Sequence, residues 1–152
     1  MKRNRPSEHD AEDGQMMVLI IGFVLLALLV TTAVMAASSL YLEHKKLLSM
    51  ADGASVAAAD SYTLGQVETQ GASPTAVLNG GRVRNVAADF LARNGAYARF
   101  SGLAVAPATG SPDGSTAVVV LSAEVHPPIV NFIIPDGIRI EAKSTARSRL
   151  TR

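Results

Sequence analysis

The feature that most constrains this chain is a run of residues 16–42 that contains no charged side chain. An α-helix rises about 1.5 Å per residue, so about 20 apolar residues cross a hydrocarbon core of about 30 Å. Leu, Ile, Val, Phe and Met fill most of the first two-thirds of the run, with one glycine, Gly22, among them. Aliphatic and aromatic residues near the centre of a helix favour membrane insertion. We therefore predict a transmembrane helix over residues 16–42.

A cleaved secretory signal is the alternative to a permanent anchor. Signal peptides have a basic start, an apolar part of about 7–15 residues and a cleavage site with small residues. The run here is longer, and the residues just before it include Glu12 and Asp13. Val34, Met35 and Ala36 resemble a cleavage site, which leaves removal before Ala37 open. We adopt the anchor as the working interpretation.

The polar residues 1–15 are expected to be a disordered cytoplasmic tail, because they mix both signs of charge and contain Pro6. Basic residues near a membrane span tend to stay in the cytoplasm. Three of them precede the run, and only Lys45 and Lys46 follow within the next twenty residues. This bias predicts a bacterial cytoplasmic-membrane protein with a single span, whose larger C-terminal part lies outside.

Composition and motifs argue against several classes of function. The formal net charge is +1 and the basic residues are scattered, so no nucleic-acid partner is expected. Cysteine is absent, which excludes disulfides, thiol nucleophiles and cysteine metal ligands. His9, His44 and His126 show no metal-ligand spacing, and no nucleophile or nucleotide motif occurs. We expect no enzyme activity, no cofactor and no metal site.

The helix is predicted to continue beyond the membrane over residues 43–60, which contain no proline. Small and apolar residues recur there at helical spacing and form one face. This predicted packing face consists of Leu47, Ala51, Ala54 and Ala58. Ala51 and Ala54 are expected to contact a second subunit, and Ala58 the protein's own domain, because small side chains allow close approach. Gly53 predicts a kink or fraying.

The first 60 residues also resemble a known family. A glycine, Gly14, stands just before the apolar run, charged residues follow the run, and an alanine-rich segment comes directly after them. This arrangement is similar to the N-terminal region of TadE/TadG-like proteins of Tad (Flp) pilus assembly. The motif falls on Leu48, Ala51, Asp52, Ala54, Ala57, Ala58 and Ala59, with Val56 among them.

The resemblance also raises the question of processing between Gly14 and Gln15. Prepilins cut by the prepilin peptidase usually carry glutamate five residues after the cleaved glycine, where this chain has Leu19. The resemblance therefore leans to the uncleaved, TadG-like side and away from a major pilin. We expect the residues before Gln15 to be retained.

The C-terminal part is predicted to be a small α+β domain over residues 76–152, joined by a linker over residues 61–75. Ser73 and Pro74 suit a helix start, Gly80 and Gly81 are expected to interrupt it, and an amphipathic helix follows over residues 82–94.

Alternating patterns then predict strands over residues 97–105, 116–125 and 138–147. Gly102 is expected to form a bulge in the first of them. An apolar connection over residues 126–137 is expected to fold back onto the core or, if exposed, to dock a partner. The chain should thus combine a long N-terminal transmembrane helix, one amphipathic helix and an antiparallel sheet of about three strands, a pilin-like architecture.

These features favour a non-enzymatic, single-pass membrane subunit of a bacterial Tad/Flp pilus or a related secretion apparatus, either minor pilin-like or an assembly protein. Its expected partners are membrane lipid and other pilus or secretion subunits, with self-association possible through the N-terminal helix. The alternative is a membrane-tethered binding module that recognises a ligand outside the cell. Pilus and secretion genes beside this one would favour the first hypothesis.

Overall fold

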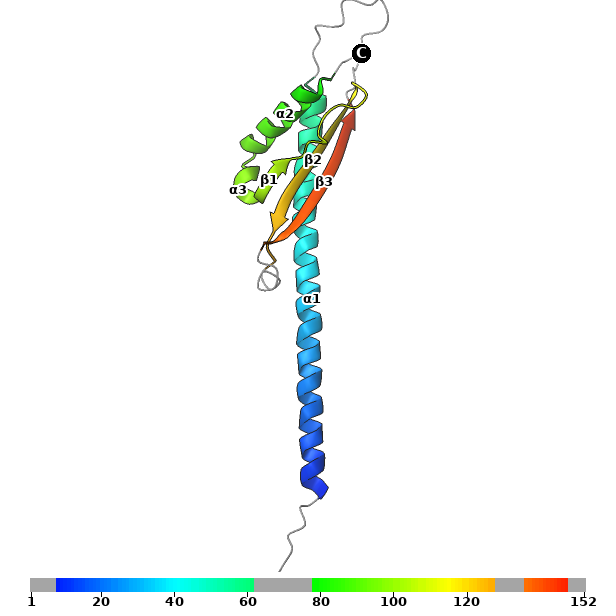
Figure 1. The fold of residues 1–152 in the computed structure, drawn as a ribbon, viewed down its shortest axis with the longest axis vertical. Helices are drawn as coiled ribbons and strands as arrows, with labels where there is room; N and C mark the ends of the chain where they lie inside the picture. The colour runs from blue at the N-terminus through cyan, green and yellow to red at the C-terminus, as the bar shows by residue number, and fades with distance from the viewer. Residues whose placement is uncertain (1–7, 62–77, 128–135, 148–152) are drawn as a thin grey trace, which may run out of the picture. The chain divides into compact units, whose positions relative to one another are not determined.

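The computed structural model describes residues 8–61, 78–127 and 136–147 (Figure 1). Its elements follow the order α1, α2, α3, β1, β2, β3. The chain divides into two compact units, residues 1–38 and 39–152, and each is described by itself. The predicted linker over residues 61–75 and most of the apolar connection over residues 126–137 lie outside the described residues.

Helix α1 (Glu8–Ala59) runs from before the apolar segment to the end of the alanine-rich one. It begins inside the segment predicted to be a tail, seven residues before Gln15, so that boundary differs from the prediction. The helix passes through Gly53 without a break, contrary to the predicted fraying.

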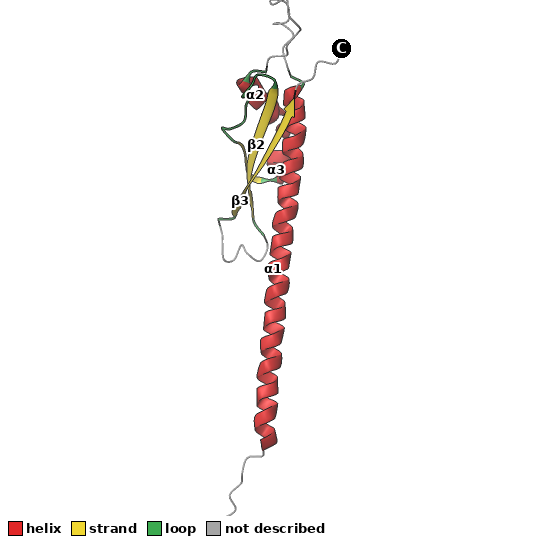
Figure 2. Ribbon diagram, turned by 90° about the vertical axis from the view of Figure 1, so that its right-hand side faces the viewer, coloured by secondary structure: helices red, strands yellow, loops and turns green. Residues whose placement is uncertain are grey.

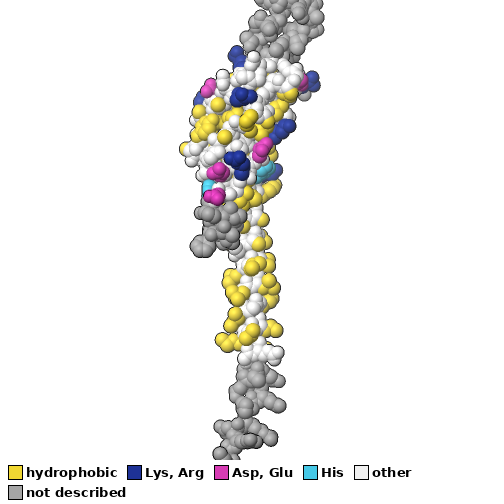
Figure 3. Space-filling model, in the orientation of Figure 1, with side chains coloured by type: hydrophobic (Ala, Val, Ile, Leu, Met, Phe, Trp, Pro, Cys, Tyr) yellow, Lys and Arg dark blue, Asp and Glu magenta, His cyan; other side chains and the backbone are white. Residues whose placement is uncertain are grey.

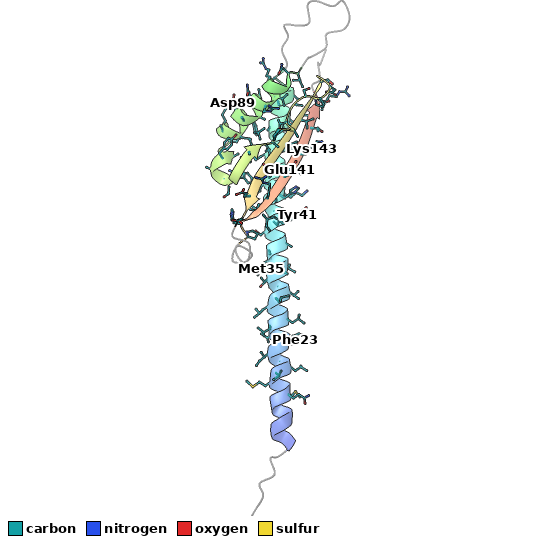
Figure 4. All side chains as sticks on the ribbon, viewed as in Figure 1. Phe23, Met35, Tyr41, Asp89, Glu141 and Lys143 are labelled. Carbon is teal, nitrogen blue, oxygen red and sulfur yellow. The ribbon has the colours of Figure 1, made fainter. Side chains whose placement is uncertain are left out.

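The part of α1 in the first unit exposes its apolar side chains. Leu19 is 72% exposed, and every described side chain of residues 16–31 is exposed. Figure 4 shows Phe23 and Met35 projecting from the helix, and Figure 3 shows apolar side chains covering this stretch. The helix from Gly14 to Ala59 is long and apolar enough to cross a membrane.

The second unit contains a three-stranded antiparallel sheet in the order β1-β2-β3 (Figure 1). Its strands are β1 (Ser101–Val105), β2 (Thr116–Val125) and β3 (Ile138–Arg147). β2 pairs with β3 along its whole length, from Thr116 opposite Arg147 to Val125 opposite Ile138. The predicted α+β class, the antiparallel sheet and the extents of the last two strands are confirmed.

The predicted first strand was too long. Residues 96–99 form the short helix α3 (Ala96–Arg99), and β1 begins only at Ser101. Gly95 adopts a left-handed conformation with φ of 63°, which starts this extra turn, and the Phe100 amide then donates to the Ala96 carbonyl. The bulge prediction is confirmed, because the β1–β2 register shifts between Ser101 and Ala104 and Gly102 has φ of 60°.

Helix α2 (Gly80–Arg93) starts two residues earlier than predicted. The Asn79 side chain accepts a hydrogen bond from the Gly81 amide, which caps the helix, so Gly80 and Gly81 form its first turn instead of interrupting it. The predicted apolar face is confirmed, since its central residues are buried, namely Val83, Ala87 and Leu91.

The core of the second unit lies between the sheet and the helices (Figure 2). Alternate residues of β2 and β3 point into it, as period-2 alternation requires. The strand residues of this core are Ala117, Val119, Leu121, Ala123, Val125, Ile140 and Ala142. The other face of β3 is exposed, and Figure 4 labels Glu141 and Lys143, which lie on it.

Candidate functional site

The predicted packing face of α1 lies inside the second unit. Its four members are each 0% exposed, namely Leu47, Ala51, Ala54 and Ala58. They belong to one buried cluster together with residues of α2, β2 and β3. All four side chains are therefore buried within the protein's own domain.

The expected subunit contact of Ala51 and Ala54 is wrong for this reason. A side chain with no exposed surface in the single chain has nothing left to offer a second subunit. Small side chains bring the backbone of α1 close to its neighbours, much as they do between membrane helices. The internal position expected for Ala58 is correct.

Two polar contacts join the second half of α1 to β3. His44 Nε2 lies 3.2 Å from the Glu141 carbonyl oxygen of β3. The buried Ser55 hydroxyl donates to the Asp52 carbonyl at 2.9 Å and lies 3.1 Å from the Ser144 hydroxyl of β3. These polar contacts flank the alanine face and fix the register of the helix on the strand.

Gly53 of α1 lies directly against Phe90 of α2. A Cβ atom at this position would lie 2.6 Å from Cζ of Phe90. The absence of a side chain therefore admits the edge of the Phe90 ring, and Gly53 serves packing instead of bending. The sequence did not predict this pairing, because a lone glycine in a helical segment looks the same whether it bends the helix or makes room for a neighbouring side chain.

Most residues of the family motif are buried or partly buried in the second unit. Ala59 is buried, and Leu48 packs against the core as a partly buried residue. Asp52 is exposed, and its carboxylate has no hydrogen-bond or ion-pair partner among the described residues. The motif thus builds the inner face of the helix and leaves one acidic side chain outside.

The possible processing site lies within α1. Gly14 and Gln15 are helical and exposed, and nothing lies within 4 Å of a Cβ built on Gly14. Leu19, at the position of the missing glutamate, is also exposed. Retention of the N-terminus remains a prediction.

Among the described residues, no group of three or more His, Cys, Asp or Glu side chains is arranged to hold a metal ion. Two of the basic residues that lie on the outer face of α2 serve structural contacts. Arg84 Nη2 donates to the Thr109 carbonyl at 3.1 Å, and Arg93 Nε donates to the Asp89 carbonyl at 3.3 Å.

The structure therefore defines a small α+β domain whose core helix continues into an apolar, membrane-span-like helix. Residues 14–61 match a family model described as putative Flp pilus-assembly TadE/G-like. No curated protein and no solved structure matches the chain significantly. The resemblance predicted from the sequence is confirmed for the matched segment, which coincides with most of α1. The apolar helix and the family match together support a pilus-assembly protein of the membrane.

Proposed function

We propose that the protein is a non-enzymatic, single-pass membrane subunit of a Tad/Flp pilus or related secretion apparatus. It acts as a minor pilin-like or assembly component, with its N-terminus in the cytoplasm and its C-terminal domain outside. Its partners are other subunits of the same apparatus and the surrounding lipid.

One observation carries this proposal. The segment that matches the TadE/G-like model, residues 14–61, holds both the apolar stretch and the buried alanine face. A single helix is therefore the candidate anchor and also the central element of the domain core. This coupling suits a subunit that must tether a folded domain to the membrane.

The mechanism that follows is positioning and lateral packing. Residues 16–35 expose large apolar side chains, which lipid or neighbouring helices would cover. The alanine face is already used within the domain, so contacts between subunits would come from the apolar stretch and from the outer surface of the domain.

The test uses a strain that assembles this apparatus. Deletion of the gene should stop or reduce pilus assembly, and the full chain should restore it. In-cell crosslinking of a tagged functional chain should recover other apparatus subunits. Recovery is expected to fail for a chain whose residues 16–35 are replaced by an unrelated apolar span, although that chain still reaches the membrane. Normal assembly without the gene would contradict the proposal.

A further inference from the structure

A polar pocket of about 270 Å³ lies in the second unit and is lined by residues of α1, of the end of α3, of the start of β1 and of the end of β2. Four of its lining residues carry ionisable side chains, namely Glu43, Arg99, Glu124 and His126. Ser39 and Ser101 add hydroxyl groups. Pockets for drug-sized ligands measure about 300–1,000 Å³, so this one suits a smaller chemical group.

The pocket holds charges of both signs that do not neutralise each other. Within the described part of the chain, neither Arg99 nor Glu124 has a hydrogen-bond or ion-pair partner, although both line the same pocket. Glu43, by contrast, is engaged by Lys46 at 2.7 Å. An unpaired guanidinium and an unpaired carboxylate in one hollow are complementary to a zwitterion, because each finds an opposite charge there.

Two glycines with positive φ make room for polar side chains of this pocket. A Cβ on Gly102, whose φ is 60°, would lie 3.0 Å from Cδ of Glu124. A Cβ on Gly137, whose φ is 74°, would lie 2.8 Å from Nε2 of His126. Both side chains are thus placed against bare backbone, where a residue with a Cβ would displace them.

Two lining residues, Ser39 and Glu43, stand at the C-terminal end of the uncharged run in the sequence, where lipid headgroups are expected. Twenty helical residues span about 30 Å, so a hydrocarbon core that starts at Met16 ends near Met35. A core centred on the uncharged run ends close to Ser39 instead. Ser39 then lies between about 0 and 6 Å beyond the core, and Glu43 about 6 Å further along the helix. Headgroups occupy this zone, since they add about 5–8 Å on each side of the core.

We infer that this pocket binds a zwitterionic phospholipid headgroup with a primary ammonium, as in phosphatidylethanolamine. Arg99 donates to the phosphate oxygens, and Glu124 accepts hydrogen bonds from the ammonium. Two carboxylates in the lining disfavour a purely anionic headgroup, and a choline ammonium has no N–H to donate. The inference rests on the membrane anchor of the proposed function but not on the role in pilus assembly.

The experiment uses the full chain reconstituted in bilayers with equal amounts of phosphatidylethanolamine, phosphatidylglycerol and phosphatidylcholine that share the same acyl chains. Lipids that stay bound after gentle detergent extraction are identified by native mass spectrometry. Phosphatidylethanolamine should exceed its molar share in the bound fraction. Arg99→Gln and Glu124→Gln should each lower this binding about tenfold or more, which is the effect expected from one lost charge-assisted contact.

Arg147→Gln and Glu141→Gln are matched controls, because they remove the same charges from exposed positions of β3 that do not line the pocket. Both should retain the lipid preference, and thermal melting of all four variants checks that they fold. Equal retention of the three lipids, or equal losses in pocket and control variants, would overturn the inference. So would binding of water-soluble glycerophosphoethanolamine as tightly as the lipid, which would assign the pocket to a free ligand. Pilus assembly is not a readout here, so failure of the subunit proposal gives a separate result.

Discussion

Thr109 lies in the segment between β1 and β2, and its hydroxyl forms hydrogen bonds with the backbone of β2 that a neighbouring strand would otherwise form. Its hydroxyl donates to the Val120 carbonyl at 3.1 Å and accepts from the Val120 amide at 3.0 Å. The Val120 carbonyl also accepts from the Ala106 amide, so only the Val120 amide depends on Thr109 alone. One buried side chain thus completes the backbone pairing of the central strand.

We expect Thr109→Val to destabilise the domain by about 1–3 kcal/mol, because it leaves the buried Val120 amide without an acceptor. Thr109→Ser keeps the hydroxyl and should cost clearly less. Chemical denaturation of the full chain in detergent measures both free energies of unfolding. Equal losses for the two variants would show that the hydroxyl contributes nothing.

Asp113 organises the turn before β2. It accepts hydrogen bonds from the Thr116 hydroxyl at 2.7 Å, the Ser115 amide at 3.0 Å and the Thr116 amide at 2.6 Å. The Thr116 hydroxyl, with the two amides, holds the pKa of this carboxyl well below its usual value. These three hydrogen bonds make Asp113 the residue that holds this turn.

A carboxyl whose pKa is lower in the folded than in the unfolded state stabilises the fold above its unfolded pKa, and this stabilisation is lost as the pH falls. Asp113→Asn should therefore be less stable than the unaltered chain at neutral pH. The difference should shrink as the pH falls below about 4, near the unfolded pKa. Melting curves of both proteins over pH 2–7 check this, and a difference independent of pH would contradict it.

At the scale of elements, the pairing of Gly53 with Phe90 shows why α1 tolerates a glycine. Alanine normally stabilises a helix by up to about 1 kcal/mol relative to glycine. In this helix the new Cβ would meet the Phe90 ring at 2.6 Å.

Gly53→Ala should therefore show its helix gain only when Phe90→Ala removes the ring. A double-mutant cycle of unfolding free energies should give a coupling of about 0.5 kcal/mol or more. If Gly53→Ala stabilises the protein equally with Phe90 and with Phe90→Ala, the close contact between Gly53 and the Phe90 ring is refuted.

The alanine face gives a second prediction at this scale. Ala54 is 0% exposed, so Ala54→Leu overpacks the core and should cost about 1–3 kcal/mol in the monomeric protein. Val56→Leu on the same helix is the control, because Val56 is 54% exposed and has room for a larger side chain. If the melting temperature of Ala54→Leu equals that of the unaltered protein, internal packing of Ala54 is contradicted and the subunit contact is favoured.

Several elements could be predicted because their sequence patterns are typical of a single type of secondary structure. The uncharged run marks α1, and apolar and polar residues alternate through β3 from Ile138 to Arg147. The partner of Ala51 could not be predicted, because a face of small residues has the same spacing whether it packs on its own sheet or on another chain. The first strand was overpredicted because Tyr97 and Phe100 suit a strand, while the left-handed Gly95 that starts α3 is a backbone feature.

At the scale of the whole molecule, the segment that matches the family model holds both the apolar stretch and the buried alanine face within one helix. The pocket charges could not be assembled from the sequence, because Arg99 and Glu124 lie on different elements and meet only in the folded unit. The apolar helix, by contrast, depends on local composition and was predictable.

The most direct test of the single-pass anchor uses the natural absence of cysteine. Lys2→Cys and Lys143→Cys each introduce one thiol, near the N-terminus and on the exposed face of β3. A membrane-impermeant maleimide is added to cells with the outer layers made permeable and the cytoplasmic membrane intact. The account predicts that the variant with a thiol at residue 143 is labelled at once and that the variant with a thiol at residue 2 is labelled only after lysis. In both variants the labelled chain should be full-length and membrane-bound. Labelling of both positions in intact cells, or a soluble product that lacks residue 2, would contradict it.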